Sequence, residues 1–461
     1  MFHFLPLFLL IYGLTPARFK NFTLLAGSLL FYALGEPKYL GILVLSVMVN
    51  YAIGRFLGAG SYFSRKSKIN LFYANYPDWQ KAVFAFAIMG NIGLLVMFKY
   101  MAGAQTLPLG ISFYTFQILA YLIDVYRGDI PAEHSFVKVA TYIVMFPQLI
   151  SGPIVNYSEV SKALESRRMT GRSVRNGLKI FILGLASKVL LADRIGMLWN
   201  DIQVRGFESI STPLAWLGAV AYSLKIYFDF YGYSLMAIGL GRMLGFQLPE
   251  NFKNPYMSRS VREFYRRWHM TLGRWFRSYV YIPLGGNRRG EVCTIRNLLI
   301  VWTLTGLWHG NTPNFLFWSG SLVLLIIVER LVQKVLDRFP VGGRPIQTQM
   351  HLLPHLYLWL VIPVTWMCFA ITDLGDLRMY LGRMFGETAA YPVLQGDWLQ
   401  SLRTYGGLLA VCLICCTPFV LKVYARWKNY LLVNVLLAAL FWICVWQIRV
   451  AGDNPFMYFR F

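Results

Sequence analysis

Charged residues are scarce in this 461-residue chain, and acidic residues are the scarcest. Only 14% of the residues are charged, against about a quarter in soluble proteins. The charge-free runs include 297–328 and 345–372, and a helix needs roughly 20 apolar residues to cross a bilayer. The composition therefore excludes an ordinary soluble protein. It predicts an all-α polytopic membrane protein with about 11 or 12 membrane segments.

The sequence also lacks the common signatures of hydrolases and nucleotide-binding enzymes. It contains no GxSxG, no Walker A motif and no HExxH, and we expect no metal site. Internal repeats, low-complexity tracts and a long polar region are absent too. We therefore predict one membrane-embedded domain over 1–461. It would have N-terminal helices at 1–105, a catalytic core at 106–330 and C-terminal helices at 331–461.

Cysteine is too rare, and too deep in apolar segments, for a disulfide framework. Of six cysteines, Cys412, Cys415, Cys416 and Cys444 lie within hydrophobic stretches. Cys412-x-x-Cys415 could be a redox or zinc pair, but no histidine is near and no second CxxC follows. The pattern favours buried free thiols, which behave as small apolar side chains.

Positive charge is in excess, with 44 Lys+Arg against 21 Asp+Glu and a net charge of +23. In a soluble protein this balance would indicate nucleic-acid binding, but in a membrane protein basic loops mark the cytoplasmic side. We therefore expect no nucleic-acid partner. The loop at 15–20 and the loop at 55–81, with Arg65, Lys66 and Lys68, are placed in the cytoplasm, which puts the N-terminus outside.

Several apolar segments are interrupted. Pro108 and Gly110 break 107–124, and FPQ at 146–148 followed by SGP at 151–153 breaks 136–157. Backbone that is not helical survives at membrane depth only inside the protein or beside a cavity, so these segments are predicted to be re-entrant or broken helices.

The segment 209–241 carries both charge and small residues. Lys225 and Asp229 lie four residues apart and can pair on one helix face. Such a pair is either functional or a structural buried ion pair, and both interpretations remain open. Gly232 and Gly239, followed by Gly241 and Gly245, would allow close backbone packing.

The densest positive charge falls in 251–311, which also contains two Trp-His pairs. Ser260 and Glu263 form a capping-box pattern, and the apolar period predicts one helix from 261 to Pro283. His269 lies at the border of the apolar stripe. Arg262 and Arg266 would keep it neutral, so it is either a catalytic base or an interfacial histidine that bonds a loop.

His309 lies in the middle of the charge-free run 297–328. Gly306, Gly310 and Pro313 interrupt the helix around it, and Asn311 is a candidate partner. A histidine at that depth either serves function or packs a helix by bonding a carbonyl. Two neutral histidines, a basic rim and no buried carboxylate pair indicate acyl or phosphate-ester chemistry, in which a base activates a substrate hydroxyl.

The motifs around these residues resemble the membrane-bound O-acyltransferase family. RWH at 267–269 and LWHG at 307–310 look like the family's histidine motifs. Further motifs resemble the alginate O-acetylase branch. They are GISFYTFQ at 110–117, DVYRG at 124–128, FPQLISGP at 146–153, DFYGYS at 229–234, IGLGR at 238–242, PENF at 249–252, YIPLGGNR at 281–288 and the ending YFRF at 458–461.

The resemblance implies a multi-helix body around a central tunnel in a bacterial inner membrane. It implies His309 as the family histidine at the narrow point and His269 as the second catalytic histidine. Acetyl-CoA would be the cytoplasmic donor, with Arg262, Arg266 and Arg274 as candidates for its phosphates, and no cofactor would be permanently bound. The acceptor would be an exopolysaccharide, reached directly or through an SGNH-type partner and a synthase complex. Transfer of D-alanyl or another acyl group, a polysaccharide flippase and a non-catalytic scaffold are the alternatives.

Overall fold

The computed structural model describes residues 4–61, 77–101, 107–150, 152–337, 353–387, 391–394 and 396–451. These residues are helical and contain no strand, as predicted. The basic residues Arg65, Lys66 and Lys68, and the YFRF ending at 458–461, lie outside the described residues.

The chain folds into two compact units. Among the described residues, 4–181 and 234–249 form the first unit, and 182–233 and 250–451 form the second. Two helices, α9 (Gly171–Ala186) and α11 (Thr212–Met243), contribute residues to both. The predicted division near 105 and 330 stays a prediction.

The first unit contains the N-terminal helices and the interrupted segments. Its helices, besides parts of α9 and α11, are α1 (Phe4–Leu14), α2 (Lys20–Gly35), α3 (Leu40–Ser61), α4 (Asp78–Val96), α5 (Ile111–Arg127), α6 (Phe136–Val144), α7 (Phe146–Leu149) and α8 (Tyr157–Glu165). Both predicted breaks are confirmed. Gly110 caps α5 in the left-handed region at φ 73°, and α6 ends before α7 begins with Pro147 in its first turn.

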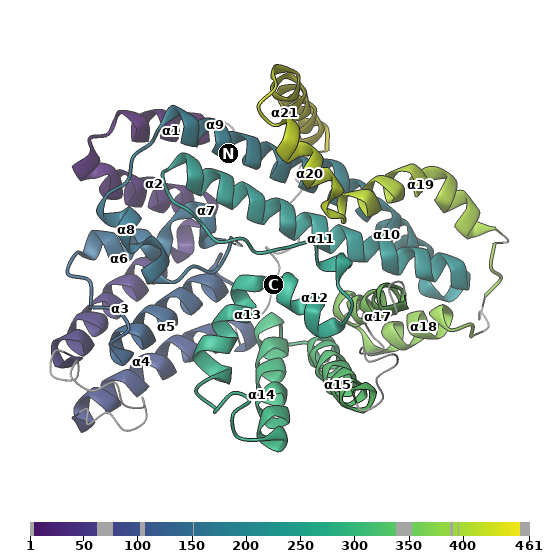
Figure 1. Cartoon of the computed structure of the whole chain (residues 1–461), viewed down its shortest axis with the longest axis horizontal. Helices are drawn as coiled ribbons and strands as arrows, with labels where there is room; N and C mark the ends of the chain where they lie inside the picture. The colour runs from purple at the N-terminus through teal and green to yellow at the C-terminus, as the bar shows by residue number, and fades with distance from the viewer. Residues whose placement is uncertain are drawn as a thin grey trace. The chain divides into compact units, whose positions relative to one another are not determined.

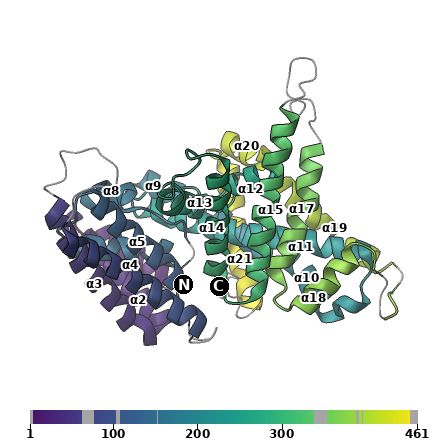
Figure 2. The same cartoon turned by 90° about the horizontal axis from the view of Figure 1, so that it is seen from below.

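The second unit contains both Trp-His pairs. Its helices are α10 (Asp193–Arg205), α12 (Val261–Arg267), α13 (Met270–Phe276), α14 (Glu291–His309), α15 (Pro313–Leu336), α17 (Leu353–Ala370), α18 (Leu374–Met384), α19 (Asp397–Cys415), α20 (Pro418–Trp427) and α21 (Leu431–Ala451). Helices α14 and α15 lie side by side, and α17 packs against α15 (Figure 1, Figure 2). The charge-free run 297–328 is therefore a helical hairpin broken between His309 and Pro313.

Six helical segments among the described residues are long and apolar enough to cross a membrane. They are Pro37–Gly58, Asp78–Met101, Pro313–Leu336, Leu353–Ala370, Asp397–Cys415 and Leu431–Val450. The other predicted segments form shorter or broken helices, or helices that carry more polar residues. The chain is thus a multi-pass membrane protein.

Glycines bring α9 and α11 into backbone contact, as predicted. A Cβ on Gly239 would lie 2.6 Å from the carbonyl oxygen of Gly177, and one on Gly232 would lie 2.6 Å from that of Gly184. Real Cβ atoms do not approach so closely, so a larger residue at these positions would force the helices apart.

The predicted pairing of Lys225 with Asp229 is wrong. Asp229 pairs with Lys188, whose Nζ lies 3.0 Å from Asp229 Oδ1, and Lys188 also contacts Asp193. The side chains of Lys188 and Asp229 are only 6% and 4% exposed. The partner comes from the segment between α9 and α10, which helical spacing along α11 could not indicate.

Candidate active site

The predicted single helix from 261 to 283 is broken at His269. Ser260 caps α12 by accepting a bond from the Glu263 N–H, as predicted, but α12 ends at Arg267. His269 then adopts the left-handed region at φ 44° and caps α13. A non-glycine residue in that region costs about 1–2 kcal/mol, so surrounding contacts must hold the break in place.

The segment that precedes α12 supplies those contacts. The Lys253 N–H donates to the Arg267 carbonyl at 2.9 Å, and the Met270 N–H donates to the Asn251 carbonyl at 2.9 Å. The side-chain oxygen of Asn251 also accepts from the Thr271 N–H at 3.2 Å and from the Thr271 hydroxyl at 2.9 Å. The segment 251–253 therefore joins both sides of the break.

The same oxygen fixes the tautomer of His269. Its Nδ1 lies 3.0 Å from Asn251 Oδ1. A backbone N–H can only donate, so the amide atom facing Thr271 is the oxygen, and His269 must donate to that oxygen from Nδ1. In a neutral imidazole the lone pair then resides on Nε2.

Burial keeps this imidazole neutral. His269 is 4% exposed and lies outside the six spanning segments, and burial lowers its pKa to about 3. The predicted neutrality is confirmed, although burial and not the neighbouring arginines is the cause. Nε2 is buried and has no hydrogen-bond partner among the described residues, so no contact in that part of the chain uses its lone pair.

His309 ends α14 within an aromatic enclosure. It is 5% exposed, and its ring centroid lies 4.9 Å from that of Trp318 and 5.3 Å from that of Phe369, both nearly perpendicular. Phe315 stacks on it at 6.2 Å. These rings come from α15 and α17, so the hairpin and its neighbour together enclose the imidazole.

The two Trp-His pairs converge on one cluster. The Trp308 ring lies 4.7 Å from that of His309 and 6.4 Å from that of His269. A second path runs from Trp268 through Trp366 to Trp318, at 4.9 and 6.0 Å. Forty residues of sequence thus separate two imidazoles that share one aromatic core.

The predicted partner of His309 is wrong. Asn311 is exposed and forms no hydrogen bond with His309 in the described part of the chain. The buried amide is Asn314, which donates to the carbonyls of Cys368 at 3.2 Å and Phe369 at 3.0 Å. Asn314 therefore ties α15 to the end of α17 behind the imidazole.

The three candidate arginines do not share one face. Arg262 and Arg266 are exposed one turn apart on α12, whereas Arg274 is half-buried on α13 beyond the break. Burial and the neighbouring Arg266 and Arg330 lower the pKa of Arg262, which indicates a crowded positive surface on α12. Their role in binding CoA phosphates stays a prediction.

Comparison with known proteins identifies the family of this chain. The model of the MBOAT, membrane-bound O-acyltransferase family, matches residues 129–371, just over half of the chain. The chain belongs to this family. The chain is therefore an O-acyltransferase with a helical membrane body.

Several named relatives cover most of the chain. The probable alginate O-acetylase AlgI of Pseudomonas putida is 35% identical over 87% of this chain and 80% of its own. The peptidoglycan O-acetyltransferase of Helicobacter pylori is 31% identical over 84% of this chain and 78% of its own. The teichoic acid D-alanyltransferase of Bacillus subtilis is 28% identical over 49% of this chain and 60% of its own.

Sequence reasoning missed Asn251 as a site residue. It falls inside the PENF motif at 249–252, which carried part of the family resemblance. Its bond to His269 spans 18 residues and depends on the break in the helix, so neither spacing nor helical period could reveal it.

Proposed function

We propose that this chain is a membrane O-acetyltransferase of the bacterial inner membrane. It takes an acetyl group from acetyl-CoA in the cytoplasm and delivers it across the membrane to a secreted or periplasmic exopolysaccharide. An SGNH-type partner and a polysaccharide synthase complex would assist delivery, and the N-terminus would lie outside. Two relatives that cover most of the chain are named for O-acetyl transfer, one to alginate and one to peptidoglycan, which supports this substrate class.

One observation carries the proposal: two buried histidines both lie against Trp308, and His269 Nε2 has no hydrogen-bond partner among the described residues. In the direct route, His309 removes the proton from an acceptor hydroxyl. The hydroxyl oxygen attacks the thioester carbonyl, the C–S bond breaks, and the thiolate takes the proton. One C–O bond replaces one C–S bond.

A relay route uses the same residues. The Nε2 lone pair of His269 attacks the thioester first, the C–S bond breaks, and the CoA thiolate takes the Nδ1 proton, which leaves a neutral acetyl-imidazole and the free thiol. The acceptor hydroxyl, deprotonated by His309, then takes the acetyl group, and the proton on His309 returns to His269. Rapid quench with labelled acetyl-CoA separates the routes, because only the relay places label on the protein.

Proteoliposomes that expose the cytoplasmic face test the proposed donor. We expect the wild-type chain to consume labelled acetyl-CoA in the presence of an acceptor polysaccharide, and His309→Ala to abolish this turnover. His134→Ala is the matched control, because His134 is exposed in the first unit. Unchanged turnover by His309→Ala would refute the enzymatic proposal as stated.

D-alanyl transfer is the second candidate, supported by the relatives named teichoic acid D-alanyltransferase. Turnover of a D-alanyl thioester in preference to acetyl-CoA in the same proteoliposomes would favour it. If the chain were a flippase or a scaffold, another protein would acetylate the polymer, and neither histidine of this chain would be needed. Wild-type acetylation by a strain carrying both His269→Ala and His309→Ala would favour that alternative.

A further inference from the structure

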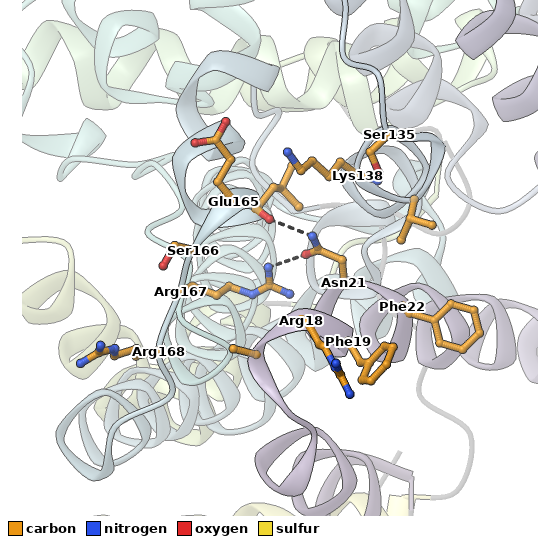
Figure 3. A pocket seen from close by; sticks show the side chains of 13 residues that line it. Arg18, Phe19, Asn21, Phe22, Ser135, Lys138, Glu165, Ser166, Arg167 and Arg168 are labelled. Carbon is orange, nitrogen blue, oxygen red and sulfur yellow. Dashed lines mark hydrogen bonds between the residues drawn. The ribbon is translucent and has the colours of Figure 1, made fainter.

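A pocket of about 810 Å³ lies in the first unit (Figure 3), whereas His269 and His309 belong to the second. It forms where the connection between α1 and α2 meets the start of α6 and the residues that follow α8. Its charged lining residues are Arg18, Lys138, Glu165, Arg167 and Arg168.

Positive charge dominates the lining. Glu165 is the one carboxylate among the lining residues, against four cations. Lys138 is paired with Glu133 at 3.5 Å, but Arg18 and Arg168 are exposed and form no ion pair in the described part of the chain. The pocket therefore presents a surplus of positive charge to whatever enters it.

Arg167 fixes the back of the pocket. It donates from Nη1 to the Asn21 side-chain oxygen at 2.5 Å (Figure 3). It also donates from Nε to the Tyr12 hydroxyl at 2.7 Å. Its Nη2 is buried without a hydrogen-bond partner among the described residues. Lys20, 8% exposed, stands close by with its Nζ 4.8 Å from the Tyr12 ring. Neither cation forms an ion pair within the part of the chain that the structure describes, and partly desolvated cations of this kind favour a bound anion.

Exposed apolar side chains also line the pocket and continue along one face of α2. Phe19 is 48% exposed and Phe22 is 63% exposed, and both line the pocket. Along α2, exposed apolar residues recur every four positions after Phe22, at Ala26, Leu30 and Leu34. This spacing places them along one face of the helix, so an apolar strip leads away from the cations.

We infer that this pocket binds the phosphate headgroup of an anionic membrane phospholipid, with an acyl chain lying along the exposed face of α2. A soluble phosphate ester would use the cations but leave the adjoining apolar strip without a partner. The 15–20 loop is also one of the two loops that the positive-inside rule places at the cytoplasmic leaflet, where anionic lipids attract basic residues. The inference does not depend on the proposed catalytic function.

Lipid binding to the full chain tests the inference. The chain is purified in detergent, stripped of lipid, and titrated with dioleoyl phosphatidylglycerol, dioleoyl phosphatidylethanolamine or coenzyme A, and bound lipid is counted by native mass spectrometry. The pocket variant is Arg18→Gln with Arg168→Gln, whose side chains form no hydrogen bond among the described residues. Arg172→Gln with Arg175→Gln, exposed on α9 in the same unit, removes the same charge elsewhere.

We expect phosphatidylglycerol to bind in preference to phosphatidylethanolamine. Each cation near an anionic surface contributes about a fivefold gain, so the pocket variant should bind about 30-fold more weakly. The control variant should change binding by about twofold or less. Equal binding of phosphatidylethanolamine, an equal loss in the control, or displacement of phosphatidylglycerol by coenzyme A would overturn the inference. Thermal unfolding of both variants identifies any loss caused by misfolding.

Discussion

Removing the side-chain oxygen of Asn251 should weaken both the fold around His269 and its chemistry. In Asn251→Ala, three donors lose their acceptor: His269 Nδ1–H, the Thr271 N–H and the Thr271 hydroxyl. Each bond contributes about 1 kcal/mol net, so we expect a loss of about 3 kcal/mol in unfolding free energy. With the tautomer and ring orientation released, kcat/KM should fall about 100-fold.

Asn251→Asp separates the catalytic role from the structural one. The carboxylate still accepts from Thr271 and from Nδ1–H, so most activity should return at neutral pH. Its charge, 3.0 Å from Nδ1, raises the pKa of His269. An acid limb absent from the wild type should then appear in the profile of kcat/KM against pH.

The assays are single-turnover acetyl transfer, thermal unfolding in detergent, and nitrogen NMR of labelled histidine to identify the protonated ring nitrogen. Wild-type kcat/KM in Asn251→Ala, with only the melting temperature lowered, would refute the reasoning. A spectrum with the proton on Nε2 in the wild type would refute it as well.

Three further predictions concern pH and packing. The folded pKa of His269, about 3, lies below its unfolded value of about 6.5, so the unfolded state binds more protons between them. The contribution of His269 to the free energy of unfolding is therefore complete above pH 6.5 and declines as pH falls towards 3. His269→Gln should make the free energy of unfolding depend less on pH over this range. Gly306→Ala should cost about 2 kcal/mol, because its Cβ would lie 2.3 Å from an α15 hydroxyl, whereas Gly320→Ala meets nothing within 4 Å and should be neutral or stabilising. Lys188→Met should lower the free energy of unfolding by about 3 kcal/mol, because Asp229 stays buried without that partner. Adding Asp229→Asn should restore part of the lost stability. Equal stability of the single and double variants would contradict this prediction.

Local signals in the sequence predicted much of the architecture. The charge-free runs, the breaks at Gly110 and Pro147, and the Ser260 cap depend on residues that are close in sequence. Chain composition and the intrinsic geometry of glycine and proline determine such features. For the same reason the helical character of both units could be predicted.

Contacts between distant segments could not be predicted. The apolar period continues through His269, yet the chain breaks there because the segment at Asn251 bonds both sides of the break. Asp229 likewise finds Lys188 across a helix interface, not Lys225 along its own helix. The break at His269 and the ion pair of Asp229 both depend on contacts between segments that are distant in sequence, which local spacing does not reveal.

The most direct test of the catalytic account is single-turnover acetyl transfer from labelled acetyl-CoA by proteoliposomes carrying His269→Ala, His309→Ala or both. We predict that each single variant loses about 1,000-fold or more, and that the double variant is little worse, because residues acting as one unit are not additive. His134→Ala should match the wild type. Activity within about tenfold of the wild type in either single variant would contradict a catalytic centre built from these two histidines.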